Sequence, residues 1–166
     1  MVVEGKIERR FEMEKKYYIA YGSNLNVKQM SRRCPTAIPL GTATLEGWNL
    51  LFKGSKSGSY LTIEPKEGAS VPVAIWEVSE RDEQYLDVYE GYPNFYYKKE
   101  LEVTFTGIVT KRKRKRTAFV YIMHEDRPFG LPSKSYVDVC AQGYMDFGFD
   151  LTRLFQAIND TKEEMQ

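Results

Sequence analysis

Apolar and polar residues alternate with a period of two along much of the chain, which is typical of half-buried β-strands. The clearest case is the stretch 97–105, where Leu101, Val103 and Phe105 share one face and Glu100 and Glu102 the other. Other stretches are rich in β-branched and aromatic residues between breaks that contain Gly or Pro. The pattern predicts six strands, over residues 17–21, 42–52, 60–64, 71–78, 97–105 and 117–123.

Four further stretches repeat apolar residues at helical spacing, and each begins at a residue that can cap a helix. Their expected starts are Asn24 or Asn26, then Ser79, then Pro132 with Ser133, and finally Asp150. Pro35, Gly91 and about Phe147 end the first three. The expected inward faces carry Val27, Met30 and Cys34 in the first helix, Tyr85, Leu86 and Tyr89 in the second, and Leu151, Leu154, Phe155 and Ile158 in the fourth.

Consecutive strands in the middle of the chain and helices toward its end indicate an α+β fold with a largely antiparallel, barrel-like sheet. A chain of 166 residues corresponds to one domain, since about 150 residues per domain is typical. We expect that single domain to span residues 17–166. Residues 1–16 alternate charges without a strong period, so they form either a frayed arm or an added N-terminal strand.

Few residues of this chain suit metal or disulfide chemistry. Cys34 and Cys140 lie far apart and in no CxxC pattern, which predicts reduced thiols in a cytoplasmic protein. His124 is the only histidine, so zinc sites built from two or three histidines are excluded. No apolar run approaches the roughly 20 residues of a membrane span, and the charged start of the chain does not resemble a signal peptide.

The net charge is only +1, from 24 basic and 23 acidic residues, but six of the basic residues form the run KRKRKR at 111–116. Nucleic-acid binders usually spread basic residues over a face and interleave aromatic side chains. A contiguous block between two expected strands favours a solvated hairpin loop, so a nucleic-acid partner is not expected.

Two short segments are candidates for chemistry. In the first, YGSN, a strand ends at Gly22 and a helix is expected to follow directly, so unpaired backbone N–H groups can face a carboxylate or a developing oxyanion. In the second, YEGYPNFYY at 89–97, Glu90 ends a helix among five aromatic residues. Both the helix end and the aromatic surroundings disfavour its charged form, which predicts a raised pKa and a base suited to neutral pH.

The order and spacing of these segments resemble the γ-glutamylcyclotransferase-like family. YGSN is followed by LDVYEGYP at 86–93, by Tyr97 seven residues after Glu90, and by FVYIM at 119–123, and the resemblance covers about residues 17–149. It implies a compact mixed β-barrel with flanking helices. The implied reaction is intramolecular: the α-amine of a γ-glutamyl group attacks its own γ-carbonyl, which closes 5-oxoproline and expels an amine or amino acid. No metal or organic cofactor is implied.

The resemblance also assigns roles to individual residues. Glu90 matches the general acid/base, and Tyr97 and Tyr121 match tyrosines that line the cavity. The residues expected to hold the γ-glutamyl moiety are Tyr21, Gly22, Ser23 and Asn24, followed by Leu25. His124 receives no catalytic role. The segments 54–59 and 124–133, where subgroups of the family differ, leave the leaving group open.

Three functions remain open at this point. The first is the cyclotransferase reaction on a γ-glutamyl amino acid. The second is the same chemistry on a γ-glutamylamine or the remnant of a crosslink. The third is a non-catalytic ligand-binding or interaction module of the same fold, in which the KRKRKR loop docks to an acidic partner. A small-molecule γ-glutamyl substrate and a location in the cytoplasm are expected for the first two.

Overall fold

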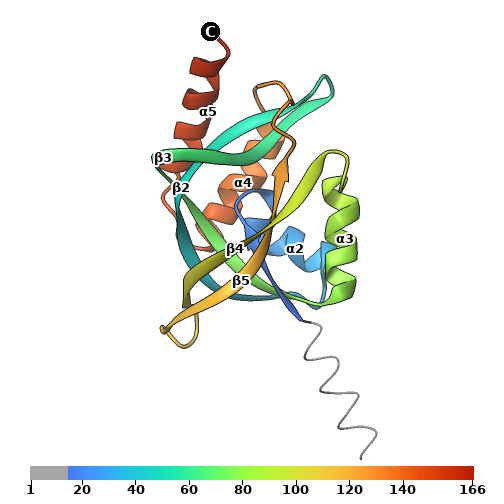
Figure 1. Ribbon diagram of the computed structural model, residues 1–166, viewed down its shortest axis with the longest axis vertical. Coiled ribbons are helices and arrows are strands. Elements are labelled where there is room, and N and C mark those ends of the chain that lie inside the picture. Colours follow the sequence, from blue (N-terminus) through green and yellow to red (C-terminus); the bar gives the residue numbers. More distant parts are fainter. Residues whose placement is uncertain (1–14) are drawn as a thin grey trace, which may run out of the picture.

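The computed structural model describes residues 15–166, and the proposed arm at 1–16 lies almost wholly outside them. Five strands close into a barrel in the order β1, β3, β2, β4, β5, which confirms the expected α+β fold with a barrel-like sheet (Figure 1). All neighbouring strands are antiparallel except β5 and β1, which close the barrel in parallel. The strands are β1 (Lys16–Ala20), β2 (Ile38–Ser55), β3 (Gly58–Val78), β4 (Tyr96–Gly107) and β5 (Lys113–Met123).

The two longest strands, β2 and β3, form one hairpin that supplies much of the barrel wall. Their register runs from Ile38 opposite Glu77 to Ser55 opposite Gly58. The separate strands expected at 60–64 and 71–78 are therefore one strand, so the sheet has five strands rather than six. The break expected between them is an irregularity in the pairing beside Gly47, whose φ is +82°. The pairing resumes on both sides of it because one long partner strand spans the whole region.

The hairpin of β4 and β5 corrects the expectation for the basic run. Lys113 to Arg116 belong to β5 and pair with residues 103–106 of β4, so only Lys111 and Arg112 lie in the connecting loop. The period-two pattern continues through the run, because Arg114 and Arg116 are half-buried whereas Lys113 and Lys115 are exposed. The guanidinium groups of Arg114 and Arg116 lie over the rings of Phe105 and Tyr17.

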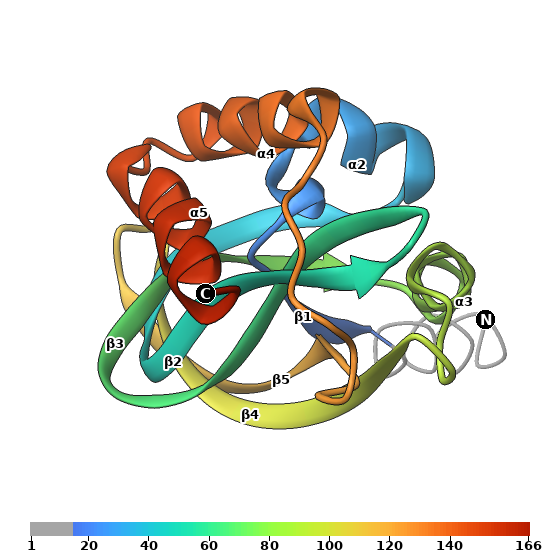
Figure 2. The same cartoon turned by 90° about the horizontal axis from the view of Figure 1, so that it is seen from above.

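The four expected helices are all present, together with one short 3₁₀ turn, η1 (Ser23–Leu25). Figure 2 shows α2 and α4 next to each other along one side of the barrel, with α5 and α3 on opposite flanks of the strands. Three predicted caps are confirmed: Asn26 accepts a hydrogen bond from the Gln29 amide, Ser79 forms a capping box with Asp82, and Ser133 accepts from the Tyr136 amide. The fourth is wrong, because the N-cap of the last helix is Leu151, and the carboxylate of Asp150 accepts from the Thr152 amide one position further in. The helices are α2 (Val27–Arg33), α3 (Glu80–Glu90), α4 (Lys134–Asp146) and α5 (Thr152–Glu164).

The three expected inward faces are each only partly right. For α2, Met30 and Cys34 are buried but Val27 is 38% exposed. Leu86 of α3 and Leu154 of α5 are fully buried, as expected. In contrast, Tyr85 and Tyr89 are each 44% exposed and Phe155 is 49% exposed. In α3 the buried positions are instead Asp82, Glu83 and Leu86, because this helix faces the barrel through charged and hydrogen-bonding groups. The spacing of apolar residues in the sequence cannot predict an inner helix face that is largely charged.

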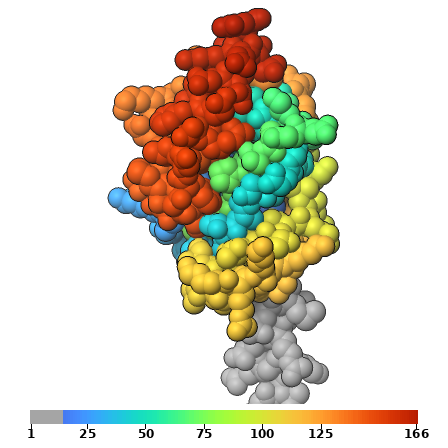
Figure 3. Space-filling model, turned by 90° about the vertical axis from the view of Figure 1, so that its left-hand side faces the viewer, coloured from blue at the N-terminus to red at the C-terminus, as the bar shows by residue number. Residues whose placement is uncertain are grey.

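The interior of the barrel is apolar, and the helices extend this core outward. Among the buried side chains are Leu50, Ile63, Val73, Ile75 and Val120. Figure 3 shows α5 and α4 packed over the strands of β2 and β3 on one side of the molecule. Both cysteines are free, as predicted, and both are buried. Within residues 15–166, no helix combines the length and the apolar character needed to cross a membrane.

Candidate active site

A cavity of about 540 Å³ lies between α3, the YGSN turn and the tip of the β2–β3 hairpin. Polar and aromatic side chains dominate its wall. The lining residues are Tyr18, Tyr21, Gly22, Ser23, Asn24, Ser55, Ser57, Tyr60, Leu61, Val88, Tyr89, Glu90, Gly91, Phe95, Tyr96, Tyr121, Arg127 and Tyr136. The two segments singled out from the sequence, YGSN and YEGYP, thus meet in one cavity although more than 60 residues separate them.

The YGSN turn leaves β1 and passes directly along the cavity wall. Tyr21 is anchored by its hydroxyl, which donates to the Tyr121 carbonyl at 2.6 Å. The turn then tightens, because the Leu25 amide donates to the Gly22 carbonyl at 3.0 Å. Leu25 itself is fully buried in the core and does not line the cavity. Its place in the site is therefore that of an anchor behind the turn.

The backbone of the turn supplies possible donors, but the helix expected directly after it does not. The amides of Gly22, Ser23 and Asn24 make no hydrogen bond within the described part of the chain. The first amide of α2, that of Val27, donates instead to a carboxylate oxygen of Asp146 at 3.0 Å. The Asp146 carboxylate therefore already occupies the N-terminus of α2. An anion bound at the YGSN turn would meet the backbone N–H groups of the turn and not those of the helix.

Glu90 is the acidic residue of the cavity wall. It is the last residue of α3, and Gly91 ends the helix in the left-handed conformation at φ +63°. The Nδ2 of Asn24 lies 3.5 Å from its Oε1, at the limit of hydrogen-bond distance. Burial raises the pKa of Glu90 to about 7, against an opposing influence of the Arg33 guanidinium. The upward shift expected from the sequence is therefore present, with burial as its cause.

Arg33, which the sequence patterns did not single out, lies behind this carboxylate. Its guanidinium donates to Oδ1 of Asn24 and stacks 3.4 Å from the ring centroid of Tyr89. Because the Asn24 oxygen accepts from Arg33, its NH₂ group is turned toward Tyr18 and Glu90. Arg33 comes from the last turn of α2, so a short local helix brings it back to the YGSN turn.

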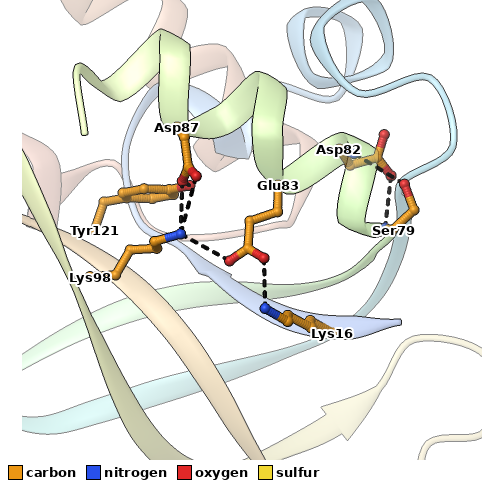
Figure 4. Close-up of polar contacts among 7 residues, drawn as sticks. All are labelled: Lys16, Ser79, Asp82, Glu83, Asp87, Lys98 and Tyr121. Atoms are coloured by element: carbon orange, nitrogen blue, oxygen red, sulfur yellow. Dashed lines mark hydrogen bonds and ion pairs between the residues drawn. The ribbon is translucent and has the colours of Figure 1, made fainter. Parts of the chain in front are cut away.

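Tyr121 reaches the cavity from β5 and is tied to α3 by a charged network (Figure 4). Its hydroxyl donates to Asp87 at 2.6 Å. Lys98 of β4 in turn contacts both Asp87 and Glu83, and Lys16 contacts the other oxygen of Glu83. Burial alone would lower the pKa of Lys98, but the hydrogen bonds to Asp87 and Glu83 raise it. The network therefore fixes α3, and with it Glu90, against the barrel.

Tyr97 does not line the cavity, in contrast to the role carried over from the family. Its hydroxyl donates to Glu125 outside the cavity, and its ring packs against His124. The neighbouring Tyr96 lines the cavity instead, and its hydroxyl donates to the Leu61 carbonyl at 2.8 Å. Adjacent residues of a strand face opposite sides, so a shift of one position exchanges the two tyrosines. His124 is not among the residues that line the cavity.

Several tyrosines of the wall were not identified from the sequence. Tyr18, Tyr60 and Tyr136 come from β1, β3 and α4 and converge only in the folded barrel. Burial raises the pKa of Tyr18 and Tyr136 well above the usual value, so both phenols are neutral donors or acceptors. The only sequence signal for them is the unusual number of tyrosines, twelve in this chain.

The arrangement offers acid/base chemistry and hydrogen bonding. Across residues 15–166, no group of three His, Cys, Asp or Glu side chains is placed to hold a metal ion. Burial raises the pKa of the Cys34 and Cys140 thiols to about 12, so neither is a thiolate at neutral pH. One carboxyl group that titrates near neutrality, surrounded by neutral hydroxyl groups and backbone amides, can move a proton within a bound substrate.

Comparisons with known proteins show what the chain as a whole is similar to. A family model described as "Gamma-glutamyl cyclotransferase, AIG2-like" matches residues 18–138. A human protein named γ-glutamylcyclotransferase is 27% identical over 143 residues, which cover 81% of this chain and 72% of the human protein. The solved structure of a γ-glutamyl cyclotransferase matches with a TM-score of 0.75 at 24% identity, and that of a human protein with 0.74 at 26%. Each match covers 87% of this chain and 86% of the other.

Proposed function

The chain belongs to the γ-glutamyl cyclotransferase, AIG2-like family, and on this premise we propose that it cyclises γ-glutamyl groups to 5-oxoproline and releases an amine or amino acid. Glu90 is the general acid/base of this reaction. The turn of Tyr21, Gly22, Ser23 and Asn24 holds the γ-glutamyl moiety. Tyr121 lines the same cavity.

The proposed reaction needs one group that first accepts a proton and then returns it. Ionised Glu90 takes a proton from the α-ammonium of the substrate, and the freed amine forms a bond to the γ-carbonyl carbon. A tetrahedral oxyanion results. Protonated Glu90 then gives its proton to the departing nitrogen as the old C–N bond breaks. The ring nitrogen loses its second proton to water as the amide forms, and the released amine takes one up from water, so atoms and charge balance and Glu90 ends in its starting form.

The remaining rate acceleration comes from binding the substrate in a bent conformation. Ring closure is already intramolecular, so the protein has mainly to keep amine and carbonyl in contact and to meet the developing oxyanion with fixed donors. The unpaired amides of Gly22 and Ser23 are suited to that role. Neutral Tyr18 and Tyr121 add hydroxyl groups that stay protonated throughout the reaction, because burial raises the pKa of both.

The observation that carries the proposal is the setting of Glu90. A carboxyl group whose pKa is about 7 is populated in both forms at neutral pH, as an acid/base requires. Within the described residues its charged form has no ion pair. A protein that only binds ligands through this fold has no need to bury an acid in this way, so the setting favours catalysis over the non-catalytic alternative.

The test is the variant Glu90→Gln, assayed for 5-oxoproline released from a panel of γ-glutamyl compounds. Glutamine keeps the size of the side chain but cannot transfer a proton, so kcat should fall by about 10²–10⁴-fold. Substrate binding should persist. The folded state holds the proton of Glu90 more tightly than the unfolded chain, so wild-type stability declines as pH rises toward 7. The variant should therefore melt at an equal or higher temperature at pH 8.

The matched control is Glu100→Gln, since Glu100 is exposed on β4 and does not line the cavity. It should retain the wild-type rate. Wild-type turnover by Glu90→Gln would remove the proposed mechanism, and a rate loss confined to Glu100→Gln would place the active carboxylate elsewhere. No release of 5-oxoproline from any compound by the wild-type protein would favour a binding module.

A further inference from the structure

We propose that Arg127 binds the carboxylate of the leaving group, so that the preferred substrates are γ-glutamyl amino acids or peptides rather than γ-glutamylamines. The inference rests on the proposed function, because it concerns which γ-glutamyl compound the same cavity accepts. It arises from the one cationic side chain among the residues that line the cavity.

The cavity has a buried end and an open end with different chemistry. At the buried end, Ser23 and Asn24 are almost inaccessible to solvent and Glu90 supplies the acid/base. At the open end, Ser57 is exposed and Arg127 half-buried. The influence of Arg33, and not of Arg127, opposes the raised pKa of Glu90. Within the described residues Arg127 therefore forms no ion pair with the acid/base, although both line one cavity.

The guanidinium of Arg127 is held in place but has its hydrogen-bond donors available. It lies 4.6 Å from the ring centroid of Phe95, which also lines the cavity. No hydrogen bond or ion pair of this side chain occurs within residues 15–166. A guanidinium stacked on an aromatic face keeps its planar row of donors free for a carboxylate, which it can bind through two parallel hydrogen bonds.

The segment that carries Arg127 is fixed to the rest of the barrel. The Gly54 amide donates to the Pro128 carbonyl at 3.0 Å, and the Gly130 amide to the Phe52 carbonyl at 3.2 Å. Lys53 donates to the Glu125 carbonyl at 3.0 Å. Figure 1 shows this segment, the orange chain after β5, beside the tip of the β2–β3 hairpin. Because the backbone is held on both sides of Arg127, the guanidinium is positioned before a ligand arrives.

The chemistry of the substrate decides which carboxylate Arg127 can meet. The glutamyl α-carboxylate shares a carbon atom with the attacking amine, so it must stay near Glu90 at the buried end. The carboxylate of a departing amino acid lies on the other side of the scissile C–N bond and points away from the forming ring. An amine leaving group lacks this carboxylate. Only an amino acid or peptide therefore gives Arg127 a partner of opposite charge.

The test compares γ-glutamylalanine with γ-glutamylethylamine, which differ only in the leaving-group carboxylate. The wild-type protein should show a higher kcat/KM for γ-glutamylalanine. In Arg127→Met, the ratio of the two kcat/KM values should fall by about 10–100-fold, the usual worth of a charge-assisted hydrogen-bonded pair. Arg127→Lys, which keeps the charge but not the planar donors, should retain part of the ratio. Turnover of γ-glutamylethylamine also reports that each variant is folded.

The matched control is Arg114→Met, because Arg114 likewise stacks on an aromatic ring, that of Phe105, but lies far from the cavity on β5. Its substrate ratio should equal that of the wild type. An equal loss on both substrates in Arg127→Met would overturn the inference, since Arg127 would then serve the glutamyl part. An unchanged ratio would overturn it as well. If the wild-type protein released 5-oxoproline from neither compound, the proposed function itself would fail.

Discussion

At the scale of single residues, the pKa of Glu90 results from two opposing influences. Burial among aromatic side chains disfavours the carboxylate, and the nearby Arg33 guanidinium favours it. The resulting pKa of about 7 leaves Glu90 partly ionised and partly protonated at neutral pH. Arg33 does not line the cavity and acts through Asn24 and through its charge, so we regard it as a positioning residue.

Replacing Arg33 by Met should move the pH profile of the enzyme. Without the positive charge the carboxylate of Glu90 is less favoured, so its pKa rises further. A general base must be ionised, so the acid limb of kcat/KM should shift to higher pH, and the variant should lose more activity at pH 6 than at pH 9. The measurement is 5-oxoproline release between pH 5 and pH 10.

Arg32→Met provides the control, because Arg32 is exposed on the same helix and one residue away. Its profile should match that of the wild type. A uniform loss across all pH values in Arg33→Met would mean that Arg33 only supports the shape of the YGSN turn, with no effect on the titration of Glu90.

The residues that could be predicted from the sequence are those with a local signature. Glu90 stands at a helix end before glycine and among aromatic residues, and those features alone indicate a raised pKa. Arg33 and Arg127 have no such signature, because their roles depend on partners that only folding brings close. These partners are Tyr89 and Asn24 for Arg33, and Phe95 for Arg127. Tyr97 was misplaced for a related reason: motif spacing cannot tell which of two adjacent tyrosines faces inward.

At the scale of elements, α3 carries the acid/base and is attached to the barrel by charge as well as by apolar contact. Glu83 and Asp87 project from one side of the helix, and Lys98 of β4 lies between them, at 3.1 Å and 2.9 Å (Figure 4). All three side chains are mostly shielded from water. Removing one charge of such a group leaves the others without compensation, which is more harmful than removing the whole group.

Lys98→Met should therefore lower the free energy of unfolding by about 1–3 kcal/mol, as expected for partly buried carboxylates left unpaired. The double variant Lys98→Met with Asp87→Asn should recover part of this loss, since one uncompensated charge is gone. Urea unfolding of these two proteins and of the single variant Asp87→Asn gives the comparison. Lys99→Met, at the next and exposed position of β4, should change stability by less than about 0.5 kcal/mol.

A loss in the double variant equal to the sum of its two single losses would show that the charges act independently. The helix would then be held by Leu86 and its other apolar contacts, and the network would only orient Tyr121.

The elements also show where periodicity succeeds and where it stops. The caps of α2, α3 and α4 were predicted because capping depends on residues three positions apart. The length of β3 was not, because its two paired parts, on either side of the irregularity, continue as one strand only through their pairing with the long strand β2. The polar inner face of α3 was missed because only folding supplies Lys98 to neutralise it.

At the scale of the whole molecule, barrel closure gathers the site from distant parts of the chain. Tyr21 and Tyr121 are 100 positions apart and share a hydrogen bond. The two hairpin tips lie at opposite ends of the molecule (Figures 1 and 3). The tip of β2 and β3 contributes Ser55 and Ser57 to the cavity wall, whereas no residue of the basic tip of β4 and β5 lines it. The basic run is thus structurally separate from the proposed chemistry.

Replacing Lys111, Arg112, Lys113 and Lys115 by Ser or Thr should therefore leave 5-oxoproline release unchanged. These four side chains are exposed, and the ion pair of Lys115 with Glu102 joins two mostly exposed groups and contributes little. Arg114 and Arg116 are kept, because their stacking on Phe105 and Tyr17 supports the hairpin. The unfolding free energy should change by less than about 1 kcal/mol.

The same variant tests whether the basic tip has a partner. A contiguous block of positive charge attracts polyanions at low salt, and such binding weakens steeply as salt rises. We expect neither the wild-type protein nor the variant to retain single- or double-stranded nucleic acid at about 200 mM salt. Retention by the wild type that disappears in the variant would assign this hairpin a nucleic-acid contact. In that case two functions would occupy opposite ends of the barrel, and a loss of nucleic-acid binding without any loss of 5-oxoproline release would show that they are independent.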